Sequence, residues 1–226
     1  MAIYDAGYLS PIKNKLGNAV GRRWRNLNVL AVYNGNPRNP RTTSQQNQRK
    51  RFSAVTELAA AFALASVKGL SKACEGQKVF PRALFIKKNF LAVTLDGGGS
   101  VTVDYTKLVM SQGGCAEASF GVPAFDTPLT VEFTLAAGNC AVYPAAVQRD
   151  IKVTTVVYCP EIGQAVVSDS VGISAASVAV EVPASWNGAR VHVYAFTQYI
   201  GEDVNDWALQ RNECSRSSYL GAGTIG

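Results

Sequence analysis

The stretch RVHVYAFTQ (190–198) decides the fold class that the sequence predicts. Between Arg190 and Gln198 its residues are β-branched, aromatic or otherwise apolar over the length of one strand. His192 is one step out of phase with the two flanking valines and therefore shares a face with Tyr194 and Phe196. A single strand histidine beside aromatic residues is usually a packed or interface side chain, so we expect no catalytic role for His192.

Further segments of strand length precede this stretch, and turn clusters of glycine, proline and asparagine separate them. They are VTVDY (101–105), LTVEFTL (129–135), DIKVTTVVYC (150–159) and VAVEVP (178–183). Successive strands of this kind indicate an antiparallel β-sandwich of the immunoglobulin-like type. The glycine-rich DGGGS (96–100) lies between two strands and lacks the spacing of a phosphate-binding loop, so it is predicted to be a hairpin turn.

One long helix is predicted to begin at RTTSQQ (41–46) and to end just before Gly69, a residue typical of the position after a C-cap. Apolar residues at three- and four-residue spacing form one stripe, which is expected to pack against the β-body. They are Phe52, Val55, Leu58, Ala59, Phe62 and Ser66. A second, shorter helix is predicted over FPRALFIKKNF (80–90), with Pro81 in its first turn.

These patterns predict a mainly β protein with one long helix in its N-terminal half, which is an α+β fold. The body is expected to be the antiparallel, immunoglobulin-like β-sandwich. The expected organisation is a basic extended arm (1–41), a helical segment (42–90) and the β-sandwich body (91–226).

Composition limits the possible classes of protein. The chain of 226 residues is long enough for a real core, and it contains no run of about 18 apolar residues that could span a membrane. Its start lacks the basic and apolar regions of a signal peptide, so none is expected. The five cysteines contain no C-x-x-C pair, and because their number is odd and no export signal is expected, they are expected to be free, mostly buried thiols of a reducing compartment. With a single histidine and no close ligand pairs, neither a metal site nor a cofactor is expected.

Positive charge is concentrated near the N-terminus. Residues 1–52 hold ten Lys and Arg against the single acid Asp5, a net charge of +9. Residues 53–226 hold 12 Lys and Arg against 15 acids, a net charge of −3. Such an asymmetry says nothing about the fold, but it is an argument about partners.

The candidate contact residues lie in KNKLGNAVGRRWR (13–25). They are Lys13, Lys15, Arg22, Arg23, Trp24 and Arg25. The cations are suited to neutralising phosphates, with the tryptophan available for stacking. Alternatively they form a solvated face, or ion pairs with an acidic neighbouring subunit, since no named DNA-binding motif is present.

A candidate acidic counter-patch follows the last long strand. It consists of Glu202, Asp203 and Asp206. Because these carboxylates lack the spacing of a calcium-binding loop, we expect an acidic surface loop. The loop is also a candidate counterpart for the basic end of a neighbouring copy.

Several motifs in a fixed order carry a resemblance to a known family. They are G-N-x-V-G-x-x-W (17–24), N-P-x-T-x-x-Q-x-x-x-R-x-x-F (39–52), IKKN (86–89), DYTKLVMSQG (104–113), VYCPEIGQAVVS (157–168), VPASWNGARVHVYAF (182–196) and CSRSSYLG (214–221), which contains S-x-S-x-Y-L-G. In this order the chain resembles an uncharacterised protein family that is common in Bacteroidota genomes and found around their phages. The resemblance implies a helix-bearing N-terminal region on β-sandwich modules, without assigned catalytic residues.

The resemblance and the charge asymmetry together predict a structural virion or assembly protein of a bacteriophage, such as a ring, neck or tail subunit. It would not be an enzyme and would act through contacts with copies of itself and with neighbouring virion proteins, with packaged DNA as a further candidate partner. We expect no membrane partner and no small-molecule substrate, and a location in the virion after synthesis in the host cytoplasm. The alternative is a basic nucleic-acid-binding accessory protein of a mobile element. A third alternative is an enzyme on a sandwich scaffold, because the fold alone does not exclude an activity.

Overall fold

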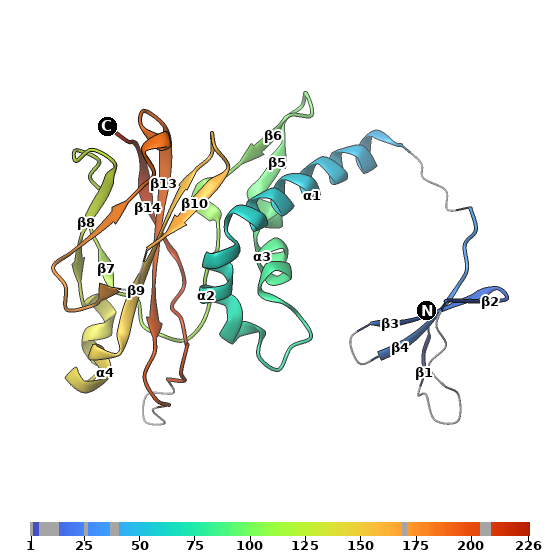
Figure 1. Cartoon of the computed structure of the whole chain (residues 1–226), viewed down its shortest axis with the longest axis horizontal. Coiled ribbons are helices and arrows are strands. Elements are labelled where there is room, and N and C mark those ends of the chain that lie inside the picture. The colour runs from blue at the N-terminus through green and yellow to red at the C-terminus, as the bar shows by residue number, and fades with distance from the viewer. Residues whose placement is uncertain (1, 5–13, 25–26, 37–40, 169–170, 204–208) are drawn as a thin grey trace. The chain divides into compact units, whose positions relative to one another are not determined.

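The computed structural model describes residues 2–4, 14–24, 27–36, 41–168, 171–203 and 209–226 (Figure 1). The chain divides into two compact units, Met1–Gln45 and Gln46–Gly226. It is of mixed composition, 30% helical and 34% strand, and its sheets are antiparallel.

The N-terminal unit contains a four-stranded antiparallel sheet in the order β1-β4-β3-β2. Its strands are β1 (Ala2–Tyr4), β2 (Asn14–Leu16), β3 (Ala19–Trp24) and β4 (Leu27–Val32). The sequence predicted a basic extended arm over residues 1–41, and the described residues of this region form a sheet of short strands. The tight turn between β2 and β3 has Gly17 at a φ of 58°, a left-handed conformation that glycine adopts without steric cost.

Three α-helices follow, and they differ from the sequence prediction in one respect. They are α1 (Thr43–Ala61), α2 (Ala63–Cys74) and α3 (Pro81–Asn89). The prediction of a single long helix that ends before Gly69 is wrong, because α1 and α2 meet at Phe62 with a bend of 92°. The shorter helix with Pro81 at its start is confirmed.

Gly69 lies inside α2 instead of ending a helix, and close packing explains its identity. A Cβ at this position would collide with the carbonyl oxygen of Met110 and with Ser111. The N–H of Gln112 donates to the carbonyl oxygen of Gly69 at 3.1 Å. The backbone of residues 110–112 therefore packs directly on α2, which only a glycine permits.

We predict that Gly69→Ala lowers the free energy of unfolding by about 1–3 kcal/mol, because backbone atoms must move to admit the methyl group. Urea unfolding followed by circular dichroism measures the change. The control is Gly97→Ala, since a Cβ there meets nothing within 4 Å. An equal effect of both substitutions would show that close packing at Gly69 is not the cause.

The second unit contains two larger sheets and a hairpin. One sheet has the order β10-β9-β13-β14, with β11 also paired to β9, and the other has the order β12-β8-β7. The strands are β5 (Val93–Leu95), β6 (Val101–Val103), β7 (Ser119–Phe120), β8 (Thr130–Ala136), β9 (Ile151–Cys159), β10 (Gln164–Val167), β11 (Val171–Gly172), β12 (Ser177–Glu181), β13 (Arg190–Tyr199) and β14 (Ser218–Thr224). Short helical segments are η1 (Phe90–Ala92), η2 (Tyr105–Lys107), η3 (Gly138–Val142), α4 (Ala145–Arg149) and η4 (Ala184–Trp186). DGGGS connects β5 to β6, so the predicted hairpin turn is confirmed.

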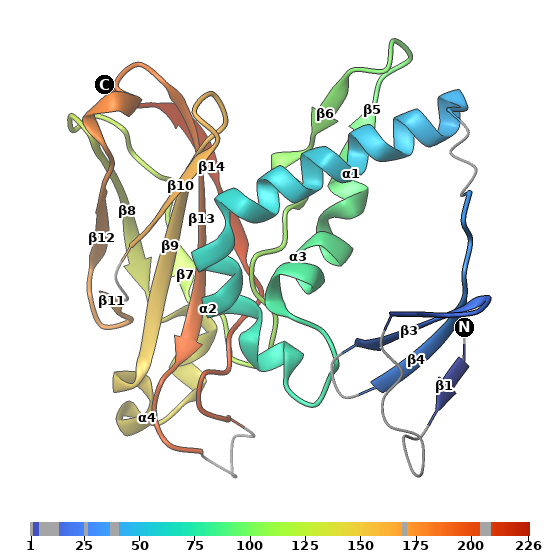
Figure 2. The same ribbon diagram turned by 45° about the vertical axis from the view of Figure 1, so that its right-hand side comes forward.

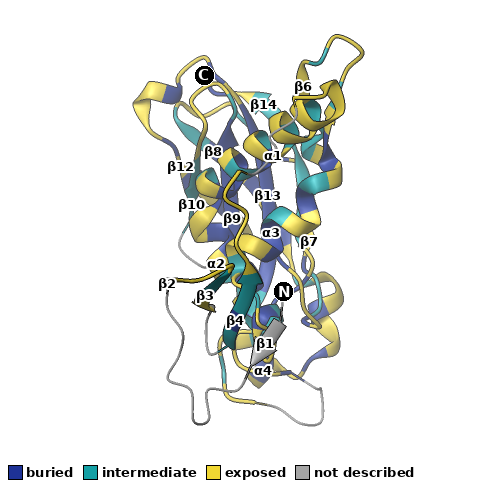
Figure 3. Ribbon diagram, turned by 90° about the vertical axis from the view of Figure 1, so that its right-hand side faces the viewer, coloured by how far each residue is buried: buried dark blue, intermediate teal, exposed yellow. Residues whose placement is uncertain are grey.

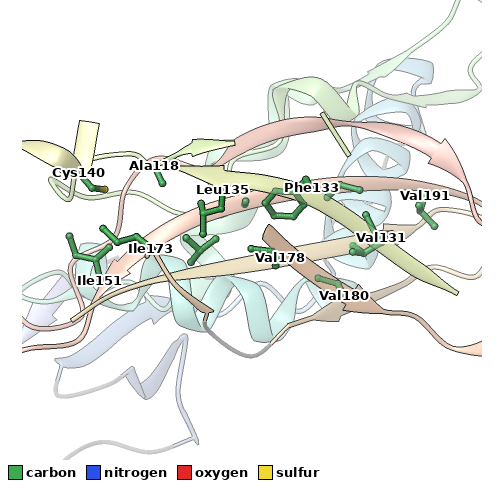
Figure 4. Packing of buried hydrophobic residues seen from close by; sticks show 14 of the residues in the cluster. Ala118, Val131, Phe133, Leu135, Cys140, Ile151, Ile173, Val178, Val180 and Val191 are labelled. Carbon is green, nitrogen blue, oxygen red and sulfur yellow. The ribbon is translucent and has the colours of Figure 1, made fainter. Parts of the chain in front are cut away.

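Strands β9 and β13 are the centre of this unit, because nearly every residue along them is buried (Figure 3). One face of their sheet packs against the β12-β8-β7 sheet, and the core between the sheets includes Phe133, Val178 and Val191 (Figure 4). The other face packs against the helices, around Phe62 and Phe85 (Figure 2). Because β9 and β13 are buried on both faces, their sequences are nearly continuous apolar runs. Buried and exposed residues instead alternate along β8 and β12.

The predicted apolar stripe on α1 is confirmed except at its first residue. Val55, Leu58 and Phe62 are at most 5% exposed, but Phe52 is 53% exposed. The preceding turn of α1 meets the body through a polar side chain, because Arg51 donates to the carbonyl oxygens of Val93 and Phe90 at 2.8 and 3.0 Å. In the turn of α1 before Val55, the side of the helix that faces the body is therefore polar. Phe52 does not lie on that side.

Two further features can be stated for the described residues. None of their helices is by itself long and apolar enough to cross a bilayer, although α1 and α2 would meet that requirement as a bent pair. The five cysteines are free and buried, which confirms the expectation of free thiols. They are Cys74, Cys115, Cys140, Cys159 and Cys214.

Candidate interface of the N-terminal sheet

The register of the N-terminal sheet determines which candidate residues share a face. Arg22 pairs with Val29, and Arg23 pairs with Asn28. Because consecutive residues of a strand point to opposite faces, the two arginines lie on opposite sides of the sheet. The cluster of cations in the sequence is therefore divided in two.

One side, which we call the basic face, holds Lys15 and Arg22, both exposed. The Lys15 ammonium lies 4.0 Å from the centre of the Tyr33 ring, a cation–π contact. Val29 on this face is 5% exposed and is a buried hydrophobic side chain of the sheet. The basic face thus combines cations with the aromatic ring of Tyr33. The spacing of these residues in the sequence did not indicate that they lie together.

The other side carries Arg23 and a row of apolar residues that crosses three strands. Leu16 pairs with Ala19, and Ala19 pairs with Val32. Leu16 is 61% exposed and Val32 is 84% exposed. We call Leu16, Ala19 and Val32 the apolar row. The sequence alone did not identify these residues as a group. Once the strands NKL, AVGRRW and LNVLAV are aligned, their alternating side chains show that the three residues share a face.

The remaining predicted contact residues are described only in part. Lys13, Arg25 and Asp206 lie outside the described residues, and so does the side chain of Trp24. Glu202 and Asp203 follow β13 and are exposed, as expected for a surface loop. The Tyr199 hydroxyl donates to the carbonyl oxygen of Glu202 at 2.7 Å. The Asp203 carboxylate accepts from the N–H of Arg211 at 2.7 Å, so this carboxylate helps to hold the loop.

His192 is a packed side chain, which is one of the two roles, packed or interface, that its position among aromatic residues predicted. Its ring stacks on Tyr105 with 4.1 Å between centroids, and its Nδ1 lies 3.0 Å from the Tyr219 hydroxyl. Burial, with a smaller effect from Arg190, lowers the pKa of His192 to about 4. The imidazole is therefore neutral at pH 7.

The buried thiols lack the environment of a reactive cysteine. Burial raises the pKa of Cys140 and of Cys214 to about 12, so both remain protonated at pH 7. Within the described part of the chain, no three His, Cys, Asp or Glu side chains are grouped as metal ligands.

Comparison with known proteins places the chain in a family. Residues 11–221 match the sequence model described as "Family of unknown function (DUF6266)". No curated protein and no solved structure matches the chain.

Proposed function

The chain belongs to this family of unknown function, and we propose that it is a structural subunit of a virus particle, a ring, neck or tail component. It acts through contacts with copies of itself and with neighbouring particle proteins, and it is not an enzyme. The observation that carries the proposal is the apolar row, whose Leu16 and Val32 are exposed on a sheet that forms a unit of its own. The particle would be a phage virion, on the resemblance described above.

Exposed apolar side chains in a row favour a protein partner. Covering a Leu or Val side chain contributes about 1.5–3 kcal/mol relative to leaving it exposed. A row that crosses three strands presents such side chains as one surface. Contact with a second apolar surface removes this surface from water, which is favourable. A head-to-tail arrangement of copies would make the same contact repeatedly and close into a ring when the rotation permits.

The division of the cations argues against nucleic acid as the main partner. A phosphate backbone that follows the basic face meets Lys15 and Arg22 but not Arg23, which lies on the opposite face of the sheet. Affinity for nucleic acid grows with the number of phosphates neutralised at once, and among the described residues of this sheet each face holds only part of the cluster. The basic face instead suits an acidic protein surface, for which the loop with Glu202 and Asp203 of another copy is a candidate.

The second unit suits the same role. We propose that its two packed sheets form a β-sandwich of the immunoglobulin-like type, with the helices on the outer face of one sheet. The shared core between the sheets and the alternation along β8 and β12 support this assignment. Such a rigid body would provide lateral contacts in a particle, where we place the protein after its synthesis in the host cytoplasm.

The test is a charge placed in the apolar row of the full chain. We expect Val32→Asp to weaken self-association at least about tenfold, measured by sedimentation velocity over a range of protein concentrations. The matched control is Val122→Asp, because Val122 is 86% exposed but belongs to the second unit. A monomeric parent protein, or equal association of parent and Val32→Asp, would contradict the proposal.

The alternative role in nucleic-acid binding is tested on the basic face. Lys15→Glu combined with Arg22→Glu reverses its two cations, and retention on immobilised DNA is measured as salt is raised. We expect weak retention of parent and variant alike. If the parent binds DNA with a steep salt dependence, and the variant loses this binding while still assembling, the nucleic-acid-binding role replaces the structural one.

A further inference from the structure

A small pocket in the second unit lies at the end of the central strands. Its volume is about 320 Å³, and it is lined by Tyr105, Pro160, Glu161, Arg190 and His192. Arg190 begins β13, and His192 lies two residues further along the same face. Pro160 and Glu161 begin the turn that follows β9, and Tyr105 comes from η2. Three segments distant in sequence thus meet at one pocket.

His192 brings an unused hydrogen-bonding nitrogen to this pocket. The side chain is only 7% exposed, and its Nδ1 is bonded to the Tyr219 hydroxyl. A neutral imidazole has one donor and one acceptor, so Nε2 still requires a partner. Among the described residues, the side-chain atoms enclosed without a partner are Thr155 Oγ1 and Trp186 Nε1. Nε2 of His192 is not among these enclosed atoms, and it forms no hydrogen bond with a described residue. A ligand in the pocket that His192 lines can therefore reach this nitrogen.

Two opposite charges line the same pocket without neutralising each other. Arg190 and Glu161 are both exposed, and within the described part of the chain they form no ion pair. An isolated anion would be attracted to Arg190 and repelled by Glu161. An isolated cation would be attracted to Glu161 and repelled by Arg190. The molecule that satisfies both side chains carries a negative and a positive group within the span of this pocket.

We propose that this pocket binds a small zwitterion of the α-amino acid class, as a ligand and not as a substrate. Arg190 holds the carboxylate, and Glu161 holds the ammonium group. Nε2–H of His192 donates to the carboxylate, which requires that the Tyr219 hydroxyl donates to Nδ1. The ring surfaces of Tyr105 and Pro160 contact the ligand's apolar side chain.

The size and composition of the pocket agree with this class. A volume near 320 Å³ is at the lower end for ligand pockets and accommodates a single amino acid. Guanidinium groups bind carboxylates through two parallel hydrogen bonds, which gives Arg190 geometric as well as electrostatic selectivity. The inference does not depend on the structural role proposed above.

The chain's single histidine makes the test specific. The full-length protein is labelled with ¹⁵N, and the imidazole nitrogen resonances of His192 are followed as L-phenylalanine is added. Two further probes each lack one charged group, namely 3-phenylpropanoate without the ammonium and 2-phenylethylamine without the carboxylate. We expect L-phenylalanine to bind at least about tenfold more tightly than either.

Two variants assign the charges. Arg190→Gln should remove the advantage of L-phenylalanine over 2-phenylethylamine, and Glu161→Gln should remove its advantage over 3-phenylpropanoate. Both side chains are exposed, so the variants should unfold at the temperature of the parent protein. If Arg190→Gln does not fold, Arg190→Lys keeps the charge, loses the paired hydrogen bonds and should bind L-phenylalanine more weakly. Unchanged imidazole resonances with L-phenylalanine, or equal binding of all three probes, would overturn the proposal.

Discussion

Phe62→Ala is expected to lower the free energy of unfolding by about 3–5 kcal/mol. Phe62 is fully buried at the junction of α1 and α2, and its ring lies 4.7 Å from that of Tyr158 and 5.7 Å from that of Phe85, centroid to centroid. Tyr194 contacts it edge-on at 6.0 Å. Truncation leaves a cavity where the helices meet the central sheet, and neighbours held by two strands and a helix collapse only partly into it.

Chemical denaturation at equilibrium measures this effect, and the chain supplies a matched control. Phe52→Ala makes the same chemical change on α1, but Phe52 is 53% exposed, so its cost should stay within about 0.5 kcal/mol. Similar losses for the two variants would mean that the helix does not pack as described. A loss below about 1 kcal/mol at Phe62 would contradict its place in the core.

The second large effect is a loss of stability in mild acid that depends on His192. Its pKa is about 4 in the folded protein, against about 6.5 in an unfolded chain, because burial and the nearby Arg190 disfavour the imidazolium. The unfolded state therefore takes up the proton first as the pH falls. The stability that the neutral imidazole contributes is fully present above pH 6.5 and is lost progressively towards pH 4, by about 3 kcal/mol in all.

This prediction is checked by urea unfolding between pH 7 and pH 4.5, compared with His192→Gln. The substitution removes the only imidazole of the chain, so the difference in slope between the two proteins isolates its contribution. A direct measurement comes from the ¹⁵N resonances of the ring, which should not titrate above pH 5. An imidazole that titrates near pH 6.5 would contradict the buried environment formed by Tyr105 and Tyr219.

Elements with a strong local pattern could be predicted from the sequence. The apolar runs at 150–159 and 190–198 are β9 and β13, and Pro81 begins α3. The turn at 96–100 is a hairpin, and the cysteines are free. For the strands and α3 neighbouring residues carry the cause, namely side-chain period or the fixed φ of proline, whereas the free thiols were expected from the odd number of cysteines.

The candidate interface shows where local patterns are insufficient. Arg22 and Arg23 are adjacent in sequence and appeared as one basic cluster, yet the sheet sends them to opposite faces. The apolar row depends on Leu16, Ala19 and Val32 being aligned across three strands. Cross-strand register is set by turns and pairing partners, so a sequence read one segment at a time does not reveal it.

By itself, therefore, the sequence determined the charge asymmetry and the positions of the central strands and of α3. Only the tertiary structure decided that the helix bends at Phe62, that Gly69 lies inside α2 and that Phe52 is exposed. It also brought Arg190, Glu161 and His192 to one pocket. Side-chain periodicity is a property of neighbours along the chain, whereas helix bends, close backbone contacts and pockets depend on segments that meet only when the chain is folded.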